Sequence, residues 1–314
     1  MQGSVFSAFL FSEVSMIEKQ ESVTAKLCTF VRAWHSNRSH MKIFDDYLAY
    51  DIMGKDEYDE MYSLVSSGFG LLKAPYKKED TEAVINEYLA PIPLSRIHFF
   101  ETRLKAFAEK HGRIQYVICG AGYDTFAFRN TDPNIHIFEI DHPDTQKNKL
   151  EKILKLEWNI PKNLDFVSVD FEKEKMSEKL LAAGFDRNVK TFFCIPGVTY
   201  YLMLPVFTDT LSQMAELSAA GSAVTFDYPE KGGKFPSRVH RLEEITHGLG
   251  EVMQGGYSYE DVSRALYSLG FQIDTFYDPK KIDEQYFSGR TDGLRAYENV
   301  DILSAVYTGG FDYE

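Results

Sequence analysis

The chain of 314 residues is poor in cysteine, in positive charge and in long apolar runs. Its three cysteines, Cys28, Cys119 and Cys194, are widely spaced and lie among apolar residues. They form neither a Cys-x-x-C pair nor any spacing typical of metal ligands. We therefore expect reduced core thiols in a cytoplasmic protein, and no metal site.

Acidic residues outnumber basic ones: the chain has 34 lysines and arginines and 47 aspartates and glutamates, so its formal net charge is −13. Such a surface repels phosphate backbones and anionic membranes, so nucleic acid and membrane partners are disfavoured. The apolar run at residues 5–11 is too short to span a bilayer and no basic leader precedes it. We expect neither export nor membrane anchoring. A small acidic substrate is not excluded, since it responds to the local field of a pocket.

The chain also lacks internal repeats, low-complexity tracts and composition shifts that would mark a linker, which favours a single domain over residues 1–314. Apolar residues at three-and-four spacing in 24–34, 83–89 and 94–108 predict helices. We expect an N-terminal helical cap over residues 1–110, followed by a core over residues 111–314.

Short apolar runs alternate with amphipathic segments in the core, which predicts an α/β fold with a doubly wound, mostly parallel sheet of seven strands. The runs are 114–119, 135–140, 164–169, 190–195, 221–226, 271–276 and 300–307. Glycine-containing segments flank a helical stretch in residues 229–257, which predicts an inserted helical lid near the mouth of the site.

The first strand ends abruptly at Gly120-Ala121-Gly122, and Asp124 follows two positions later. The second strand ends about twenty residues on at Asp141, where an acid can accept hydrogen bonds from ribose hydroxyls. A nicotinamide dinucleotide motif would require a third glycine where this chain has Thr125. The pattern therefore favours a nucleoside cofactor with a cationic amino acid end, such as S-adenosylmethionine. A purely structural strand-to-helix turn is the alternative.

Five ordered blocks carry a resemblance to a known family. They are 95–100 (SRIHFF), 120–129 (GAGYDTFAFR), 138–143 (FEIDHP), 169–171 (VDF), and 184–186 (GFD) leading into 196–202 (PGVTYYL). The chain resembles the class I S-adenosylmethionine-dependent O-methyltransferases of the leucine carboxyl methyltransferase branch, over about residues 24–307. It is most similar to bacterial members associated with polyketide and secondary-metabolite methylation. The resemblance implies a Rossmann-like methyltransferase sheet.

The resemblance implies a set of cofactor-binding residues. Arg96 would pair with the methionine carboxylate. Asp141 would accept both ribose hydroxyls, while Asp170 would accept from the adenine amino group and Phe171 would offer its amide and an apolar wall. The segment Gly120, Ala121 and Gly122 would pass beneath the methionine moiety. Asp124 has two open roles, as a cap of the next helix or as a water-mediated partner of the cofactor ammonium.

One position departs from the family pattern. The block ending in Tyr-Tyr-Leu usually opens with an acidic residue near the cofactor, and this chain has Pro196 there. Either the cofactor site is weaker, or another group substitutes for the acid, with Asp227 after the next strand as a candidate. This departure keeps open a second function, that of a cofactor-binding protein that has lost catalysis and acts as a regulatory or interaction subunit.

We expect methyl transfer from S-adenosylmethionine to a small-molecule oxygen, with S-adenosylhomocysteine as product and a carboxylate acceptor preferred to a phenol. A carboxylate is already ionised at neutral pH and needs no strong base, whereas a phenol would use one. Three histidines are candidate bases by location only: His98, His142 and His240. Thr199, Tyr200 and Tyr201 follow the fourth strand and are candidates for orienting the acceptor.

Overall fold

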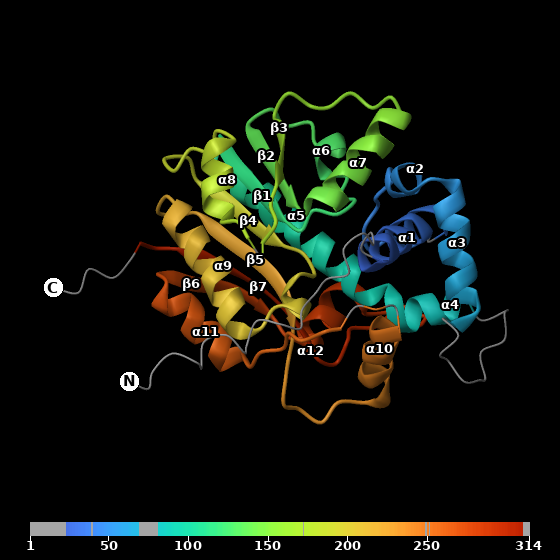
Figure 1. The fold of residues 1–314 in the computed structure, drawn as a ribbon. Helices are drawn as coiled ribbons and strands as arrows, with labels where there is room; N and C mark the ends of the chain where they lie inside the picture. The colour runs from blue at the N-terminus through green and yellow to red at the C-terminus, as the bar shows by residue number, and fades with distance from the viewer. Residues whose placement is uncertain are drawn as a thin grey trace, which may run out of the picture.

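The computed structural model describes residues 23–38, 40–68, 81–171, 173–248, 250 and 252–309, so the run at 5–11 lies outside the described residues. Seven strands form one sheet in the order β3-β2-β1-β4-β5-β7-β6 (Figure 1). The strands are β1 (Ile114–Cys119), β2 (Ile135–Asp141), β3 (Leu164–Ser168), β4 (Thr191–Ile195), β5 (Ala223–Pro229), β6 (Phe271–Tyr277) and β7 (Val300–Tyr307). Strands β1 to β5 pair in parallel, and β7 runs antiparallel to β5 and β6. The predicted mostly parallel α/β sheet is confirmed.

Strand β1 is buried along its whole length. Ile114, Tyr116 and Ile118 contact one apolar cluster, and Val117 and Cys119 contact the cluster on the opposite face. Successive strand residues point to opposite faces, so a sheet covered on both sides needs a continuous apolar run. This is the reason that the run at 114–119 contains few polar residues.

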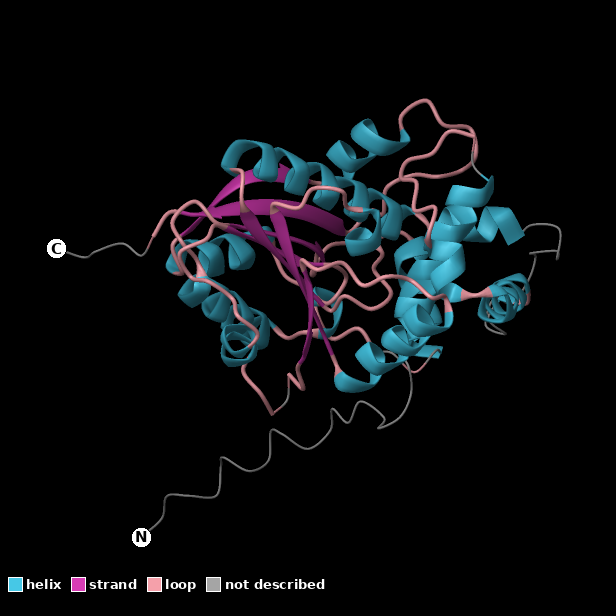
Figure 2. Cartoon of the chain, turned by 90° about the horizontal axis from the view of Figure 1, so that it is seen from above, coloured by secondary structure: helices cyan, strands magenta, loops and turns pink. Residues whose placement is uncertain are grey.

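Helices form the region before the sheet and cover both faces of it, as Figure 2 shows from above. The N-terminal helices are α1 (Val23–Arg38), α2 (Ala49–Met53), α3 (Lys55–Ser66), α4 (Thr81–Val84), the π-helix η3 (Ile85–Leu89) and α5 (Pro91–His111). The later helices are α6 (Phe126–Arg129), α7 (Pro143–Lys155), α8 (Met176–Ala182), η4 (Thr199–Tyr201), α9 (Leu204–Leu217), α10 (Ser237–Gly248), α11 (Tyr259–Ser268), α12 (Pro279–Ile282) and η5 (Asp283–Phe287). Helix α10 lies within residues 229–257, where the sequence predicts a helical stretch.

Helix α5 leads directly into β1 and carries the predicted Arg96. It begins with Pro91 at its first turn, where a missing N–H is tolerated, and it is capped after His111 by Gly112, which has φ of +72°. In Figure 1, α1, α2 and α3 gather at one side of the molecule, away from α8, α9 and α11.

The three cysteines are free thiols. Cys119 and Cys194 are buried as expected, but Cys28 on α1 is only half-buried and contacts a polar side chain described below.

No helix among the described residues is long and apolar enough to cross a membrane. Within the same residues, no group of three or more histidine, cysteine or acidic side chains has a metal-binding arrangement.

Candidate functional site

The turn after β1 is built around two glycines with left-handed backbone. Gly120 has φ of +77° and Gly122 has φ of +50°. A Cβ on Gly120 would overlap with the side chain of Val198, and a Cβ on Gly122 would lie 3.3 Å from Cβ of Ala25 on α1. Backbone conformation and space therefore both favour glycine at position 120. This segment, residues 120–122, is called the glycine turn below.

Asp141 at the end of β2 is hydrogen-bonded to the glycine turn. Its Oδ2 accepts from the N–H of Gly122 over 2.5 Å, and its Oδ1 accepts from the N–H of His142 over 2.7 Å. Burial raises the pKa of Asp141 above its usual value, against the two N–H donors, which lower it. Each carboxylate oxygen has two acceptor sites, so both oxygens keep capacity for one further donor.

Asp124 lies at the start of α6. Its Oδ1 accepts from the N–H of Phe126, the first residue of α6, over 2.7 Å. Its carbonyl oxygen accepts from Nζ of Lys149 over 2.6 Å, and the same ammonium lies 2.5 Å from Oε2 of Glu139. The sequence analysis missed this buried pair, although the signal was visible as a glutamate inside the apolar strand β2. The pair fixes the backbone just after the glycine turn.

A second buried network joins the N-terminal helices to the same loop. The carboxylate of Asp46 is fully buried and lies 2.6 Å from Nη1 of Arg32 on α1 and 3.4 Å from Nε of Arg129 on α6. The hydroxyl of Thr125 donates to Oδ1 of Asp46 over 2.6 Å, and Nη2 of Arg32 donates to the carbonyl of Tyr123 over 2.9 Å. No motif in the sequence identified Asp46 or Arg32.

Arg96 on α5 lies at the ends of β4 and β5. Its Nη1 is 3.2 Å from Oδ2 of Asp227, and its Nη2 is 3.2 Å from Sγ of Cys28. A Cβ on Gly197 would overlap with this guanidinium, so the arginine fills the space above that glycine. Burial opposes the charge, but the Asp227 carboxylate raises the pKa of Arg96 further above its usual value. The guanidinium therefore remains charged.

The carboxylate of Asp227 is fully buried and binds several groups after β4. Its Oδ1 accepts from the N–H of Gly197 over 2.9 Å, and its Oδ2 accepts from the hydroxyl of Tyr200 over 2.8 Å. The hydroxyl of Thr199 donates to the carbonyl oxygen of Asp227 over 2.5 Å. Burial raises the pKa of Tyr200 well above its usual value, as does the adjacent carboxylate. Tyr200 is therefore a hydrogen-bond donor at neutral pH.

The remaining predicted residues take other positions. Tyr201 donates to the hydroxyl of Thr24 on α1 over 3.1 Å. Asp170, just after β3, has Oδ2 2.7 Å from Nζ of Lys173, and Phe171 is 49% exposed. Pro196 directly follows β4.

The three candidate histidines do not meet at one point. His98 on α5 packs edge-on against Tyr286, and burial lowers its pKa. His142 caps α7 by accepting from the N–H of Asp144 over 3.3 Å. His240 is exposed on α10, with Nδ1 3.3 Å from a carboxylate oxygen of Glu243.

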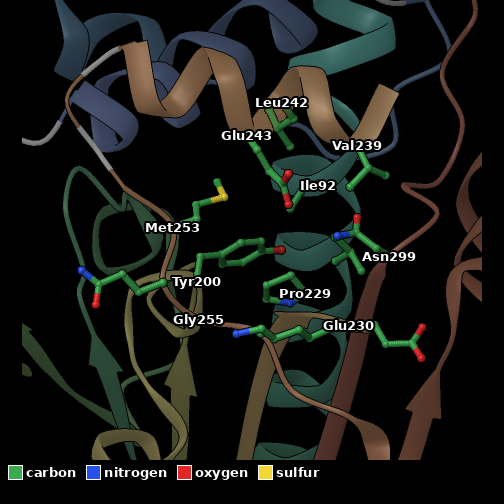
Figure 3. A pocket seen from close by; sticks show the side chains of 14 residues that line it. Ile92, Tyr200, Pro229, Glu230, Val239, Leu242, Glu243, Met253, Gly255 and Asn299 are labelled. Atoms are coloured by element: carbon green, nitrogen blue, oxygen red, sulfur yellow. The ribbon is translucent and has the colours of Figure 1, made fainter. Parts of the chain in front are cut away.

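A pocket of about 160 Å³ lies between α10, the segment 253–256 and the adjoining ends of β5 and β7. Figure 3 shows the ring of Tyr200 at the pocket wall and the carboxylate of Glu243 directed inward from α10. The side chain of Glu230 points away from the pocket in the same view, while Lys231 also belongs to the lining. Tyr200 thus has its ring in the pocket and its hydroxyl on Asp227.

Comparison with known proteins gives consistent matches. A profile described as leucine carboxyl methyltransferase matches residues 25–215. The putative S-adenosyl-L-methionine-dependent methyltransferase YktD of Bacillus subtilis (strain 168) is 33% identical over 306 residues, which are 93% of this chain and 99% of that protein. A putative S-adenosyl-L-methionine-dependent methyltransferase of Parafrankia sp. (strain EAN1pec) is 30% identical over 205 residues, 65% of this chain and 62% of that protein.

Among solved structures, a DUF574 family protein from Streptomyces avermitilis MA-4680 has a TM-score of 0.52 and 13% identity, covering 78% of this chain and 96% of that chain. At that identity the likeness concerns the fold.

Proposed function

We propose that this chain, which belongs to the leucine carboxyl methyltransferase family and is an S-adenosylmethionine-dependent methyltransferase, methylates an oxygen of a small molecule. The acceptor would bind in the pocket beneath α10. The preferred acceptor is a carboxylate of a secondary metabolite, with a phenol second. The proposed place of action is the cytoplasm, in keeping with three free thiols.

The residues at the carboxyl edge of the sheet fit this cofactor. The glycine turn leaves a cradle that a Cβ at position 120 would distort. Asp141 keeps two acceptor positions suited to the ribose hydroxyls, and the Arg96 guanidinium suits the methionine carboxylate. Ala121 and Asp124 would line the methionine end, and Asp170 and Phe171 the adenine end. When bound, the cofactor supplies an electrophilic methyl group on a sulfonium.

The position of Tyr200 carries the assignment of the pocket. Its hydroxyl is bound to Asp227, beside the predicted cofactor residue Arg96, while its ring forms part of the pocket wall. A molecule in the pocket would therefore contact the ring of Tyr200, whose hydroxyl lies toward the residues proposed to bind the cofactor. The chain would contribute alignment of the two reactants and exclusion of water, which suffice for an in-line displacement.

Two observations favour a carboxylate acceptor. Lys231 belongs to the pocket lining and offers an anion a cationic partner. A carboxylate, with a pKa of roughly 4, also needs no general base. His98 and His142 are engaged elsewhere, against Tyr286 and at the start of α7. The inward carboxylate of Glu243 is the feature that favours the phenol, because it could accept a proton.

The test begins with calorimetric titration of the purified protein with S-adenosylmethionine and S-adenosylhomocysteine, with NADH as control. Release of S-adenosylhomocysteine is then measured with panels of carboxylic acids and phenols. We expect binding of the first two ligands and turnover with carboxylic acids. Cofactor binding without turnover on any acceptor would favour the non-catalytic alternative, which Pro196 keeps open.

A pair of variants tests the pocket itself. Met253→Trp places a bulkier side chain in the pocket, whereas Val252→Trp alters the neighbouring side chain, which is 51% exposed. We expect Met253→Trp to raise the acceptor KM about tenfold or more with unchanged cofactor affinity, since an overfilled site costs about 1–3 kcal/mol. Equal acceptor KM values in the two variants would contradict the placement of the acceptor.

A further inference from the structure

The register of the sheet places Asp227 beside Pro196. Strands β4 and β5 are parallel, and their pairing ends at Ile195 with Phe226. Pro196 directly follows Ile195 at the end of β4, and Asp227 directly follows Phe226 within β5. The N–H of Gly197 donates to Oδ1 of Asp227 over 2.9 Å, so the carboxylate lies against the turn that begins at the proline.

We propose that Asp227 is a positioning residue for methyl transfer, and that it supplies from β5 the buried carboxylate that position 196, directly after the neighbouring strand β4, lacks. This inference rests on the proposed function, because it takes Arg96 as a cofactor ligand and Tyr200 as a wall of the acceptor pocket. Asp227 acts on both reactants through these two side chains.

The contacts of Asp227 connect the two halves of the site. Its Oδ2 lies 3.2 Å from Nη1 of Arg96 and 2.8 Å from the hydroxyl of Tyr200. One oxygen therefore fixes the guanidinium that would meet the cofactor and the ring that borders the pocket. Its Oδ1 and its carbonyl oxygen hold Gly197 and Thr199, which orders the turn between them.

Charge balance gives the carboxylate a role that a neutral side chain could not fill. The Asp227 side chain is fully buried and that of Arg96 is only 12% exposed. An unpaired charge in such surroundings is strongly unfavourable, so each of the two groups stabilises the other. An amide at position 227 keeps the shape and one acceptor oxygen, but it leaves the guanidinium without a counter-charge and free to reorient.

The first experiment compares wild-type protein with Asp227→Asn, using cofactor titration and steady-state kinetics with an acceptor found by turnover screening. We expect a cofactor Kd about tenfold higher and a kcat about tenfold lower for the variant. Asp301→Asn removes another buried aspartate, on the neighbouring strand β7, and controls for loss of a buried carboxylate as such. We expect it to leave the cofactor Kd unchanged.

Two further variants separate positioning from general stability. Pro196→Glu in the Asp227→Asn background returns a carboxylate to the adjacent position, and we expect it to recover cofactor affinity at least in part. Tyr200→Phe removes one of the two groups held by Oδ2, and we expect its effect on kcat to be less than additive with that of Asp227→Asn. Merely structural damage would give neither rescue nor non-additivity.

Wild-type turnover with an unaffected Asp227→Asn variant would overturn the inference while leaving the proposed function intact. Cofactor binding without turnover in the wild type would instead contradict the proposed function. The cofactor Kd values of wild type and Asp227→Asn would still show whether Asp227 positions Arg96 for cofactor binding. If Asp227→Asn does not fold, Tyr200→Phe alone decides. A raised acceptor KM with unchanged cofactor Kd supports the inference, and an unchanged KM contradicts it.

Discussion

The hydroxyl of Thr125 lies 2.6 Å from Oδ1 of Asp46, and this contact joins the loop after β1 to the N-terminal helical region. The same carboxylate pairs with Arg32 and Arg129. Position 125 is where a dinucleotide-binding motif would have its third glycine. The structure gives a physical reason for threonine there, because its hydroxyl satisfies a fully buried carboxylate.

Removal of the Asp46 carboxylate is expected to destabilise the protein strongly. Asp46→Ala leaves the guanidinium groups of Arg32 and Arg129 with fewer counter-charges, and breaking a buried pair costs about 3–5 kcal/mol. The adjacent Asp45→Ala is a matched control, because its side chain is 48% exposed and pairs with Lys42 at the surface. We expect a loss below about 1 kcal/mol there. Urea unfolding measures both, and similar losses would contradict the role of Asp46.

The strands were predictable because their signal is local. A sheet covered on both faces needs continuous apolar runs, so all seven runs reappear as strands with bounds shifted by at most a few residues. The glycine turn was visible because its backbone needs positive φ. The partners of the site residues were not predictable. Arg96 and Asp227 are 131 positions apart and Asp46 and Thr125 are 79 apart, and no pattern in one sequence records such contacts.

Asp141→Ala is expected to weaken S-adenosylmethionine binding. The substitution removes the proposed acceptor of the ribose hydroxyls and also the partner of the Gly122 N–H in the glycine turn. We expect a loss of about 1–3 kcal/mol in binding free energy, which is roughly a 5- to 150-fold rise in Kd. Asp144→Ala serves as the control, since its side chain is 66% exposed in the first turn of α7. Calorimetry showing the same Kd for Asp141→Ala and wild type would refute the placement of the ribose.

Acid is expected to destabilise the protein through His35 on α1. Its Nε2 accepts from the N–H of Ile43 over 2.8 Å, which requires a ring without a proton on that nitrogen. Burial, followed by the charge of Arg290, lowers the pKa of His35 from 6.5 to about 4. Between those two pH values the unfolded chain binds more protons than the folded one, so stability conferred by the neutral ring is complete above pH 6.5 and falls as the pH drops toward 4.

The loss through His35 should amount to at most roughly 3 kcal/mol, and it should be absent from a variant that cannot titrate there. His35→Gln keeps an acceptor for the Ile43 N–H and has no ionisable group. Urea unfolding of both proteins across this pH range gives the comparison. The difference in unfolding free energy between wild type and variant should shrink as the pH falls. A difference independent of pH would show that His35 titrates alike in both states.

Gly255→Ala is expected to impair acceptor binding while sparing cofactor binding. The N–H of Gly255 donates to the carbonyl of Tyr200 over 2.8 Å, and an added Cβ would overlap with the backbone carbonyl of Thr199, which cannot move aside as a flexible side chain could. The segment 253–256 would have to shift away from η4, and the pocket wall beside Tyr200 would shift with it. Overpacking of this kind costs about 1–3 kcal/mol, so we expect an acceptor KM about tenfold higher at an unchanged S-adenosylmethionine Kd. Val252→Ala alters an exposed side chain just before the same segment, which is not part of the pocket lining, and should leave both constants near their wild-type values. A raised cofactor Kd in Gly255→Ala would instead place this segment over the cofactor rather than over the acceptor.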